Sequence, residues 1–387
     1  MTKTTAIIGA RIFDGDTWHE GKALVVGDGK VSAIVAPDAV PSGADRVDAA
    51  GQILVPGFID LQVNGGGGVL LNEKHDVDAI AAICAAHAKF GTTALLPTLI
   101  TDTAEIRTGT IKAGRDAAAK GVPGFIGLHL EGPHLSAARK GVHDPALIRP
   151  MEQADLEEML ACRDAFDALM ITVAPESTTT EQVAELANAG FIVSLGHTDT
   201  DCVTAGRYFK SGARTVTHLF NAMSPLGHRE PGVVGATLDS SNVYAGLIAD
   251  GFHVDPVAMG VALRAKNGPG RIFLVTDAMS TIGTDDTGFL LNGRQIYRKD
   301  GRLTLADGTL AGADIDMLSS VRFVHEKLGF PLEEAVRMAS VYPAEAVRLE
   351  ARKGKLQPGF DADFVLLTGE LAMGSTWIGG EQVFSAS

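Results

Sequence analysis

Short apolar runs of the kind that form buried β-strands alternate with helix-length, alanine-rich runs through the middle of this 387-residue chain. We find eight strand-like runs, at residues 55–63, 92–99, 125–130, 168–174, 192–195, 215–220, 244–248 and 272–276. The helical runs lie between or after them, at residues 77–89, 104–120, 179–189, 201–210 and 316–328. Such alternation indicates an α/β protein in which parallel strands are joined by crossover helices, and eight strands close most economically into a (β/α)₈ barrel.

The two ends of the chain have a different pattern. The first fifty residues hold short β-type runs separated by turn signals, which predicts a small antiparallel sheet. The final segment has the same character, so we expect both ends to meet in one β-domain. The predicted limits are residues 1–54 and 355–387 for this domain and 55–354 for the barrel, with a hairpin inserted at 288–310.

Charge and cysteine content exclude several classes of protein. The chain carries 33 Lys+Arg against 47 Asp+Glu, a net charge of −14, which disfavours binding to nucleic acid or to anionic membranes. Cys84, Cys162 and Cys202 are far apart and form no C-x-x-C pair, which is typical of a reducing cytosol. No apolar run approaches the roughly 20 residues of a membrane span. We therefore expect a cytoplasmic protein with neither a nucleic-acid nor a membrane partner.

Polar residues follow several predicted strands at the end where barrels carry their active sites. Glu131, His197 and His218 come from three different strands, and one carboxylate with two imidazoles suits Zn²⁺ or a related divalent ion. Taken singly, each histidine is better explained as a hydrogen-bonded residue at the barrel rim. Three buried ionisable groups together are costly unless they are paired or bind a metal. The pattern therefore predicts a metal site.

Further candidates lie on neighbouring strand ends. Asp277 follows the eighth strand, where a carboxylate beside a metal can accept a proton from water, although a helix cap or turn also explains it. The Asn221-Ala222 turn, Arg229 and His253 combine backbone N–H groups with cationic side chains, as phosphate sites do. An ordinary surface arginine and loop histidine are the alternative.

Two sets of motifs resemble known families. Five motifs together resemble those of the amidohydrolase superfamily. They are Pro56-Gly-Phe-Ile-Asp60, Gly196-His197-Thr-Asp199, His218-Leu-Phe-Asn221-Ala-Met, Val275-Thr-Asp277-Ala and Pro358-Gly-Phe-Asp-Ala-Asp-Phe-Val. Five further motifs resemble those of one family within it, the N-acetylglucosamine-6-phosphate deacetylases. They are His129-Leu-Glu131-Gly-Pro, Lys140-Gly-Val-His143, Arg229-Glu-Pro-Gly232, Asp250-Gly-Phe-His253 and Leu310-Ala-Gly-Ala. The motifs occur in order over nearly the whole chain.

This resemblance implies a distorted (β/α)₈ TIM barrel, flanked by a small β-sandwich domain formed by both termini, and a homodimer. It implies that Glu131, His197 and His218 bind the metal and that Asp277 is the general base and acid. His143 is implied as the group that polarises the acetyl carbonyl. The implied sugar-phosphate contacts are Asn221, the backbone of Ala222, Arg229 and His253.

One departure from the superfamily pattern bears on the metal content. Most amidohydrolases carry His-x-His on the first strand for a second metal, whereas this chain has Gln62-Val-Asn64, and amides are poor ligands for transition metals. The fourth strand has no lysine for a bridging carbamate. We therefore predict one divalent metal per subunit, with Gln62 and Asn64 hydrogen-bonding around the site and the substrate. Zn²⁺ is the first expectation, and Fe²⁺, Mn²⁺ and Co²⁺ are alternatives.

The implied reaction is hydrolysis of N-acetyl-D-glucosamine 6-phosphate to D-glucosamine 6-phosphate and acetate, in amino-sugar catabolism. Water activated by the metal attacks the acetamide, and Asp277 takes its proton and delivers it to the sugar nitrogen. N-acetylgalactosamine 6-phosphate or another N-acyl amine is the alternative substrate. A non-catalytic barrel used for assembly is the alternative from another class, but such a barrel is expected to lack the ligands that are present here.

Overall fold

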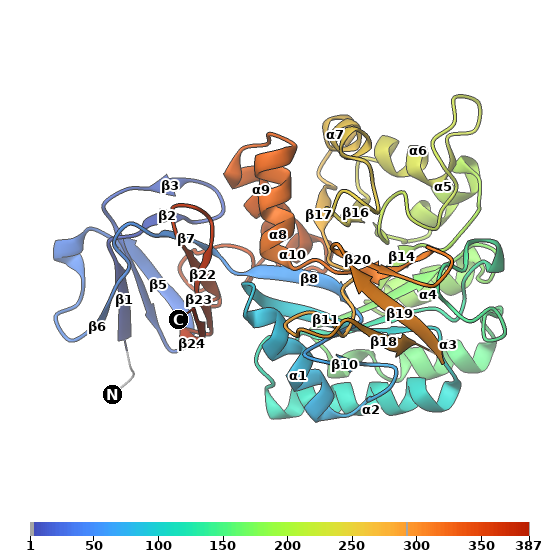
Figure 1. Ribbon diagram of the computed structural model, residues 1–387, viewed down its shortest axis with the longest axis horizontal. Helices are drawn as coiled ribbons and strands as arrows, with labels where there is room; N and C mark the ends of the chain where they lie inside the picture. The colour runs from blue at the N-terminus through green and yellow to red at the C-terminus, as the bar shows by residue number, and fades with distance from the viewer. Residues whose placement is uncertain (1–3, 292, 387) are drawn as a thin grey trace.

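The computed structural model describes residues 4–291 and 293–386. Its centre is an eight-stranded sheet in which every strand runs parallel to the next along the chain (Figure 1). The strands are β8 (Phe58–Val63), β11 (Thr92–Ile100), β12 (Gly127–Glu131), β13 (Ala168–Val173), β14 (Ile192–Leu195), β15 (Thr215–Val216), β16 (Tyr244–Leu247) and β17 (Ile272–Leu274). The predicted (β/α)₈ barrel is confirmed.

Helices surround this sheet (Figure 1). They are α1 (Val77–Ala88), α2 (Ala104–Lys120), α3 (Gln153–Leu160), α4 (Thr180–Asn188), α5 (Cys202–Lys210), α6 (Gly232–Asp239), α7 (Pro256–Ala265), α8 (Met317–Arg322), α9 (Leu332–Ala339) and α10 (Val341–Ala346). Four of the predicted helices match α1, α2, α4 and α5 within a residue at each end, and α8 begins the fifth. Helix α2 shows why: the Thr103 side chain accepts a bond from the N–H of Ile106, and Gly121 ends the helix at a φ of 62°.

Helix α6 was not predicted from the sequence. All of its residues except Asp239 are buried, so it lacks the polar face that gives a surface helix its 3.6-residue period.

Both ends of the chain form the β domain, as predicted. One sheet has the order β5-β4-β1-β6, and the other, β24-β23-β22-β7-β2-β3, combines strands from the two ends. The strands are β1 (Thr4–Ile8), β2 (Arg11–Phe13), β3 (Trp18–His19), β4 (Ala23–Gly27), β5 (Lys30–Val35), β6 (Asp45–Asp48), β7 (Ile53–Pro56), β22 (Phe364–Leu367), β23 (Met373–Ile378) and β24 (Glu381–Ser385). Ile7 and Leu24 of the first sheet share a core with Leu54 and Trp377 of the second, so the two sheets pack as a sandwich.

The expectation of a purely antiparallel N-terminal sheet was wrong. Strand β1 pairs in parallel with β6, and β2 in parallel with β7. The chain between β5 and β6 crosses to the far edge of the first sheet instead of turning back as a hairpin, and a crossing connection makes the pair parallel. The limits 1–54, 355–387 and 55–354 stay a prediction.

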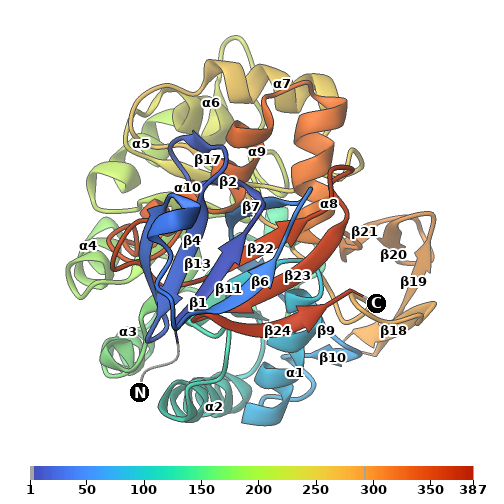
Figure 2. The same cartoon turned by 90° about the vertical axis from the view of Figure 1, so that its left-hand side faces the viewer.

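The predicted hairpin at 288–310 was too small. The segment forms a four-stranded antiparallel sheet of β18 (Gly288–Leu291), β19 (Arg294–Lys299), β20 (Arg302–Thr304) and β21 (Leu310–Ala313), because the chain reverses twice more after the first turn, at Asp300-Gly301 and between Leu305 and Thr309. Figure 2 shows this sheet beside the ring of helices. Its Leu291, Ile296 and Leu303 form a small core with Met279, which follows β17. The insertion is thereby attached to the carboxyl end of the barrel.

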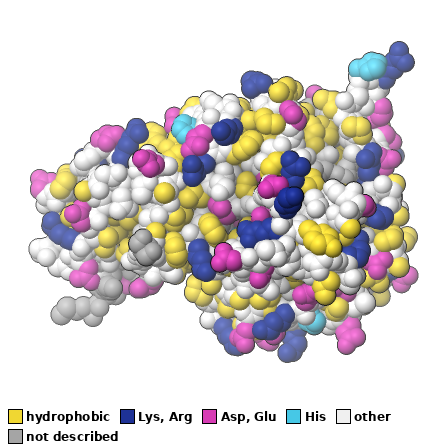
Figure 3. All heavy atoms as spheres, in the orientation of Figure 1, with side chains coloured by type: hydrophobic (Ala, Val, Ile, Leu, Met, Phe, Trp, Pro, Cys, Tyr) yellow, Lys and Arg dark blue, Asp and Glu magenta, His cyan; other side chains and the backbone are white. Residues whose placement is uncertain are grey.

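Basic and acidic side chains are interspersed over the face of the molecule that Figure 3 shows. Within residues 4–291 and 293–386, no helix combines the length and the apolar character needed to cross a membrane.

Two buried histidines make the fold sensitive to acid. Burial lowers the pKa of His87 and of His134 from the usual 6.5 to about 4. The unfolded chain therefore binds these protons near pH 6.5, whereas the folded chain binds them only near pH 4, so the free energy of unfolding falls as the pH falls through this window. The loss at pH 4 is on the order of 3 kcal/mol for each histidine. Urea unfolding at pH 7 and pH 5 measures it.

The variant His87→Gln is expected to lose less stability than the wild type between pH 7 and pH 5. His228 is exposed, so His228→Gln serves as the matched control and should follow the wild type. An unchanged pH dependence in His87→Gln would contradict the prediction.

Candidate active site

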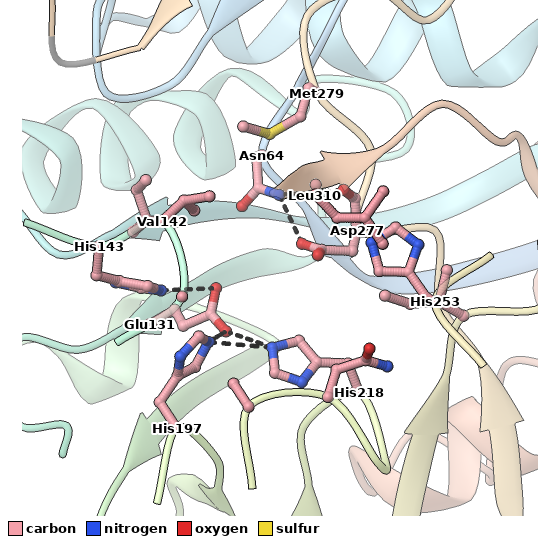
Figure 4. Close-up of a pocket in the computed structure, with 16 residues that line it drawn as sticks. Asn64, Glu131, Val142, His143, His197, His218, His253, Asp277, Met279 and Leu310 are labelled. Atoms are coloured by element: carbon pink, nitrogen blue, oxygen red, sulfur yellow. Dashed lines mark hydrogen bonds and ion pairs between the residues drawn. The ribbon is translucent and has the colours of Figure 1, made fainter. Parts of the chain in front are cut away.

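Four side chains from different strands meet at the carboxyl end of the barrel (Figure 4). Glu131 is the last residue of β12, His197 and His218 each lie two residues beyond β14 and β15, and Asp277 lies three residues beyond β17. Glu131, His197 and His218 are buried, Asp277 is half-buried, and all four line one cavity. The carboxyl ends of parallel strands lie on the same side of a barrel. Residues that follow different strands in the sequence therefore lie close together in space.

Three polar atoms lie at ligand-like separations. Glu131 Oε1 is 3.2 Å from His197 Nε2 and 3.4 Å from His218 Nε2, and the two nitrogens are 3.1 Å apart. Ligands bound tetrahedrally at the usual zinc distances lie about 3.3–3.4 Å from one another. The three atoms therefore fit around one divalent cation.

The hydrogen bonds of His197 and His143 assign different tautomers to the two rings. His197 Nδ1 donates to the carbonyl oxygen of Arg139 at 2.8 Å, which leaves the Nε2 lone pair of the neutral ring free for a metal. His143 Nδ1 instead accepts a bond from the N–H of Thr101 at 3.2 Å, so the proton of the neutral ring sits on Nε2. The neutral His197 ring can therefore offer its Nε2 lone pair to a cation, whereas the neutral His143 ring carries a proton on Nε2.

An alternative group of possible ligands, Glu131, His143 and His197, brings its ligand atoms within 4.8 Å of one another. His143 Nε2 is 4.0 Å from Glu131 Oε2, which is longer than the separations around His218. Burial and the neighbouring His197 lower the pKa of His143 to about 3, so its ring is neutral near pH 7. The trio with His218 is the tighter of the two groups.

Charges at the site are strongly coupled. Burial opposes ionisation of Glu131, but hydrogen bonds from His197 and His218 outweigh it and hold the pKa of this carboxyl well below its usual range. For His218, the Glu131 carboxylate outweighs the opposing effect of burial and raises the pKa. Burial and the nearby Glu131 charge raise the pKa of Asp277. One carboxylate therefore stays ionised while its neighbour holds a proton more readily, a pairing that suits acid and base work.

The two amides of the first strand hold Asp277. Asn64 Nδ2 donates to Asp277 Oδ1 at 2.7 Å, as Figure 4 shows. Gln62 Nε2 donates to both Glu131 Oε1, at 3.1 Å, and Asp277 Oδ1, at 3.2 Å. Gln62 and Asn64 thus act here as hydrogen-bond donors to the carboxylates.

Backbone strain is concentrated at this site. Among the described residues, nine other than glycine have a positive φ, and five of them lie at the strand ends that form the cavity. These five are His197 (48°), His218 (29°), Phe220 (79°), Ala222 (50°) and Asp277 (51°). Such conformations persist only where the surroundings hold them, and they cluster at functional sites.

The predicted phosphate contacts separate into two groups. Asn221, Ala222 and His253 line the same cavity as Glu131, His197 and His218, and Figure 4 shows His253 beside Asp277. His253 Nδ1 is 2.6 Å from Asp250 Oδ2, which fixes the ring. Arg229 does not line this cavity; it is exposed on the loop between β15 and α6.

Several residues of the site were missed from the sequence. Ile100, Val142 and Leu310 add an apolar wall to the cavity, and Leu310 comes from the inserted sheet. Thr101 and the Arg139 carbonyl hold the two histidines. The motifs Leu310-Ala-Gly-Ala and Lys140-Gly-Val-His143 contain Leu310 and Val142, but no role could be predicted for these residues, because backbone groups and apolar walls carry no distinctive residue type.

A parallel barrel with this Glu-His-His group and an adjacent carboxylate has the residues of a metal-dependent hydrolase. The chain matches the amidohydrolase family over residues 53–383. It therefore belongs to the amidohydrolase family and is a hydrolase.

Individual relatives are similar over almost the whole chain. An N-acetylgalactosamine-6-phosphate deacetylase from Shewanella sp. (strain ANA-3) is 40% identical over 380 residues, 98% of this chain and 95% of that protein. An N-acetylglucosamine-6-phosphate deacetylase from Haemophilus influenzae is 35% identical over 362 residues, 93% of this chain and 94% of that protein. The crystal structure of N-acetylglucosamine-6-phosphate deacetylase from Pasteurella multocida has a TM-score of 0.95 at 35% identity, covering 99% of this chain and 100% of that one. The resemblance inferred from the motifs is confirmed.

Proposed function

We propose that this chain hydrolyses the acetamide of N-acetyl-D-glucosamine 6-phosphate to D-glucosamine 6-phosphate and acetate. The observation that carries the proposal is a single cavity lined by the Glu131-His197-His218 trio, Asp277 and the Asn221-Ala222 turn, in a chain similar to deacetylases of amino-sugar phosphates. We place the reaction in amino-sugar catabolism in the cytoplasm. The three free cysteines are consistent with that compartment.

In this proposal Glu131, His197 and His218 hold one divalent cation, with Zn²⁺ as the first expectation. Such a cation supplies Lewis acidity, which polarises a carbonyl and lowers the pKa of water from 15.7 toward about 7. Gln62 and Asn64 occupy the place of a second pair of ligands but donate to Asp277, which argues for one metal per subunit.

Asp277 transfers the proton in both halves of the reaction. Its carboxylate takes the proton of the attacking water and then delivers it to the sugar nitrogen, which leaves as an amine. The raised pKa of the carboxyl favours holding that proton between the two steps. Its hydrogen bonds to Asn64 and Gln62 both use Oδ1, which leaves Oδ2 for the proton.

His143 polarises the acetyl group. Its Nδ1 accepts from Thr101, so Nε2–H is available to donate to the carbonyl oxygen, where negative charge develops during attack. A donor that is already fixed in place stabilises this charge without reorganising.

The phosphate end of the substrate lies toward Asn221, Ala222 and His253. We propose that Arg229 reaches the phosphate in the cavity of a partner subunit, because Arg229 is exposed and does not line its own cavity, although Asn221 and Ala222 of the same loop do. Exposed apolar side chains on this loop and on α7, including Leu226 and Val257, support a homodimer.

N-acetylgalactosamine 6-phosphate is the second candidate substrate. It is favoured by the 40% identity to the Shewanella protein of that activity, which exceeds the 35% identity to the Haemophilus protein. The two sugars differ only in the orientation of the C4 hydroxyl.

The proposal is tested by kcat/KM for acetate release from N-acetylglucosamine 6-phosphate, from N-acetylgalactosamine 6-phosphate and from unphosphorylated N-acetylglucosamine. A preference for a phosphorylated sugar of 10²-fold or more, about 2.7 kcal/mol of transition-state binding, is expected. The better epimer identifies the substrate. Equal rates with and without phosphate would refute the anion site.

Arg229→Ala is expected to lower kcat/KM for the phosphorylated sugar by about 10–10²-fold and to leave the unphosphorylated sugar almost unchanged, because a charge-assisted bond to phosphate is lost. The neighbouring exposed His228→Ala is the matched control. Equal losses on both substrates would mean that Arg229 has a structural role.

A further inference from the structure

The barrel sheet is not closed by strand pairing. Its order runs from β17 to β8, and within the described chain no ladder joins these two end strands. Beyond the ends of the two strands, an isolated bridge between Val63 and Ala278 connects the segments, and the N–H groups of Asn64 and Gly65 donate to the carbonyl oxygen of Ala278. The seam passes directly beside Asp277, so whatever closes it also sets the position of the proposed acid and base.

Asp60 spans the seam from inside the barrel. It lies on β8 with no exposed surface. Its Oδ1 accepts from the N–H of Gln62 and from the N–H of Thr276, each at 3.2 Å. Its Oδ2 accepts from the Thr276 hydroxyl at 2.5 Å. The side chain thus supplies the acceptors that a neighbouring strand would otherwise offer to Thr276.

The two residues that Asp60 holds are the neighbours of the reacting group. Thr276 precedes Asp277 in the chain, and the N–H of Asp277 donates to the carbonyl oxygen of Gln62 at 2.9 Å. The Gln62 side chain in turn contacts both Asp277 and Glu131. Asp277 has a φ of 51°, which needs firm support from its neighbours.

We propose that Asp60 is a positioning residue for Asp277: it clamps β8 to β17 and so holds the Asp277 carboxylate at the productive distance from the scissile amide. The inference rests on the proposed role of Asp277. Displacing a catalytic group by on the order of 1 Å can lower the rate by about 10²-fold. Loss of a clamp of this kind should therefore lower kcat.

The clamp depends on acceptors in the right place more than on charge. Burial raises the pKa of Asp60 to about 7, although Thr276 and the Gln62 N–H oppose the rise. An asparagine keeps one oxygen for the two N–H groups, and its amide can donate to the Thr276 hydroxyl oxygen. Asp60→Asn is therefore the conservative variant, and Asp60→Ala removes the clamp.

The matched control is Asp363, a buried carboxylate of the β domain. It pairs with Lys353 at 2.6 Å and accepts from the N–H of Gly379, far along the chain from the site. Asp363→Ala is expected to reduce stability but to leave kcat unchanged. Each variant is assayed as metal-loaded protein well below its melting temperature, with its bound metal counted.

Asp60→Ala is expected to lower kcat by about 10²-fold, with KM within about threefold of the wild type and the bound metal unchanged. Asp60→Asn is expected to recover kcat to within about fivefold. If Asp60→Ala behaves like Asp363→Ala, the proposal is overturned. If Asp60→Ala does not fold, Thr276→Val and Thr276→Ser replace Asp60→Ala and Asp60→Asn. Only Thr276→Val is then expected to have a reduced kcat.

Hydrogen exchange of the Thr276 and Asp277 amides keeps this test separate from the substrate assignment. Both amides are expected to exchange faster in Asp60→Ala than in the wild type, and near the wild-type rate in Asp60→Asn. Unchanged exchange in Asp60→Ala overturns the clamp. A wild-type protein that releases acetate from no amino-sugar phosphate refutes the proposed function, while the exchange data still decide whether Asp60 closes the seam.

Discussion

Asp277→Asn is expected to lower kcat for acetate release by at least 10²-fold, and toward 10⁴-fold, because it removes the only group proposed to move the proton in both steps. The amide has the same shape, and its oxygen can keep the bonds from Asn64 and Gln62 that now reach Oδ1. KM and the metal content should therefore change little. Steady-state kinetics on metal-counted protein measures the effect.

The control for Asp277→Asn is Asp363→Asn, which makes the same chemical change at a buried carboxylate of the β domain. Its kcat should match the wild type. Near-normal turnover by Asp277→Asn would refute the assignment of Asp277 as acid and base. Loss of metal from this variant would instead show that Asp277 is a ligand.

Removal of the metal is the second large effect. Chelation is expected to abolish hydrolysis, and one equivalent of Zn²⁺ per subunit should restore it, because Glu131, His197 and His218 form a single three-ligand set. A metal present at 100 times its dissociation constant also stabilises the folded chain by about 2.7 kcal/mol, so the melting temperature should fall when it is removed.

Glu131→Gln tests the ligand set directly, because it replaces a charged ligand with a poor one and should reduce the bound metal to well below one equivalent. His143→Gln distinguishes the two possible trios. Since the His143 tautomer is that of a donor, its variant should keep the metal and lose activity. Two equivalents in the wild-type protein, or loss of metal from His143→Gln, would contradict the site proposed here.

Much of this fold could be predicted from local signals. The eight buried runs and the capped helix α2 carry their own periodicity and end signals, so their type and position follow from short stretches of sequence. The candidate site residues Glu131, His197, His218 and Asp277 could be predicted because barrel topology brings the strand ends together. Parallel pairing in the β domain and the size of the inserted sheet depend on which distant segments meet, and no local pattern carries that information.

The amino-acid sequence by itself determined the class of fold and the residues able to do chemistry, since strand period, helix caps and the positions of Glu131, His197, His218 and Asp277 are properties of the chain alone. Only the tertiary structure decided how those residues are used. The tautomers of His143 and His197 depend on Thr101 and on a carbonyl oxygen brought in by folding. The support of Asp277 depends on the hydrogen bonds between Asp60 and Thr276, which are 216 residues apart in the sequence. Hydrogen bonds between distant segments form only when the barrel closes, so their geometry is absent from any local reading of the sequence.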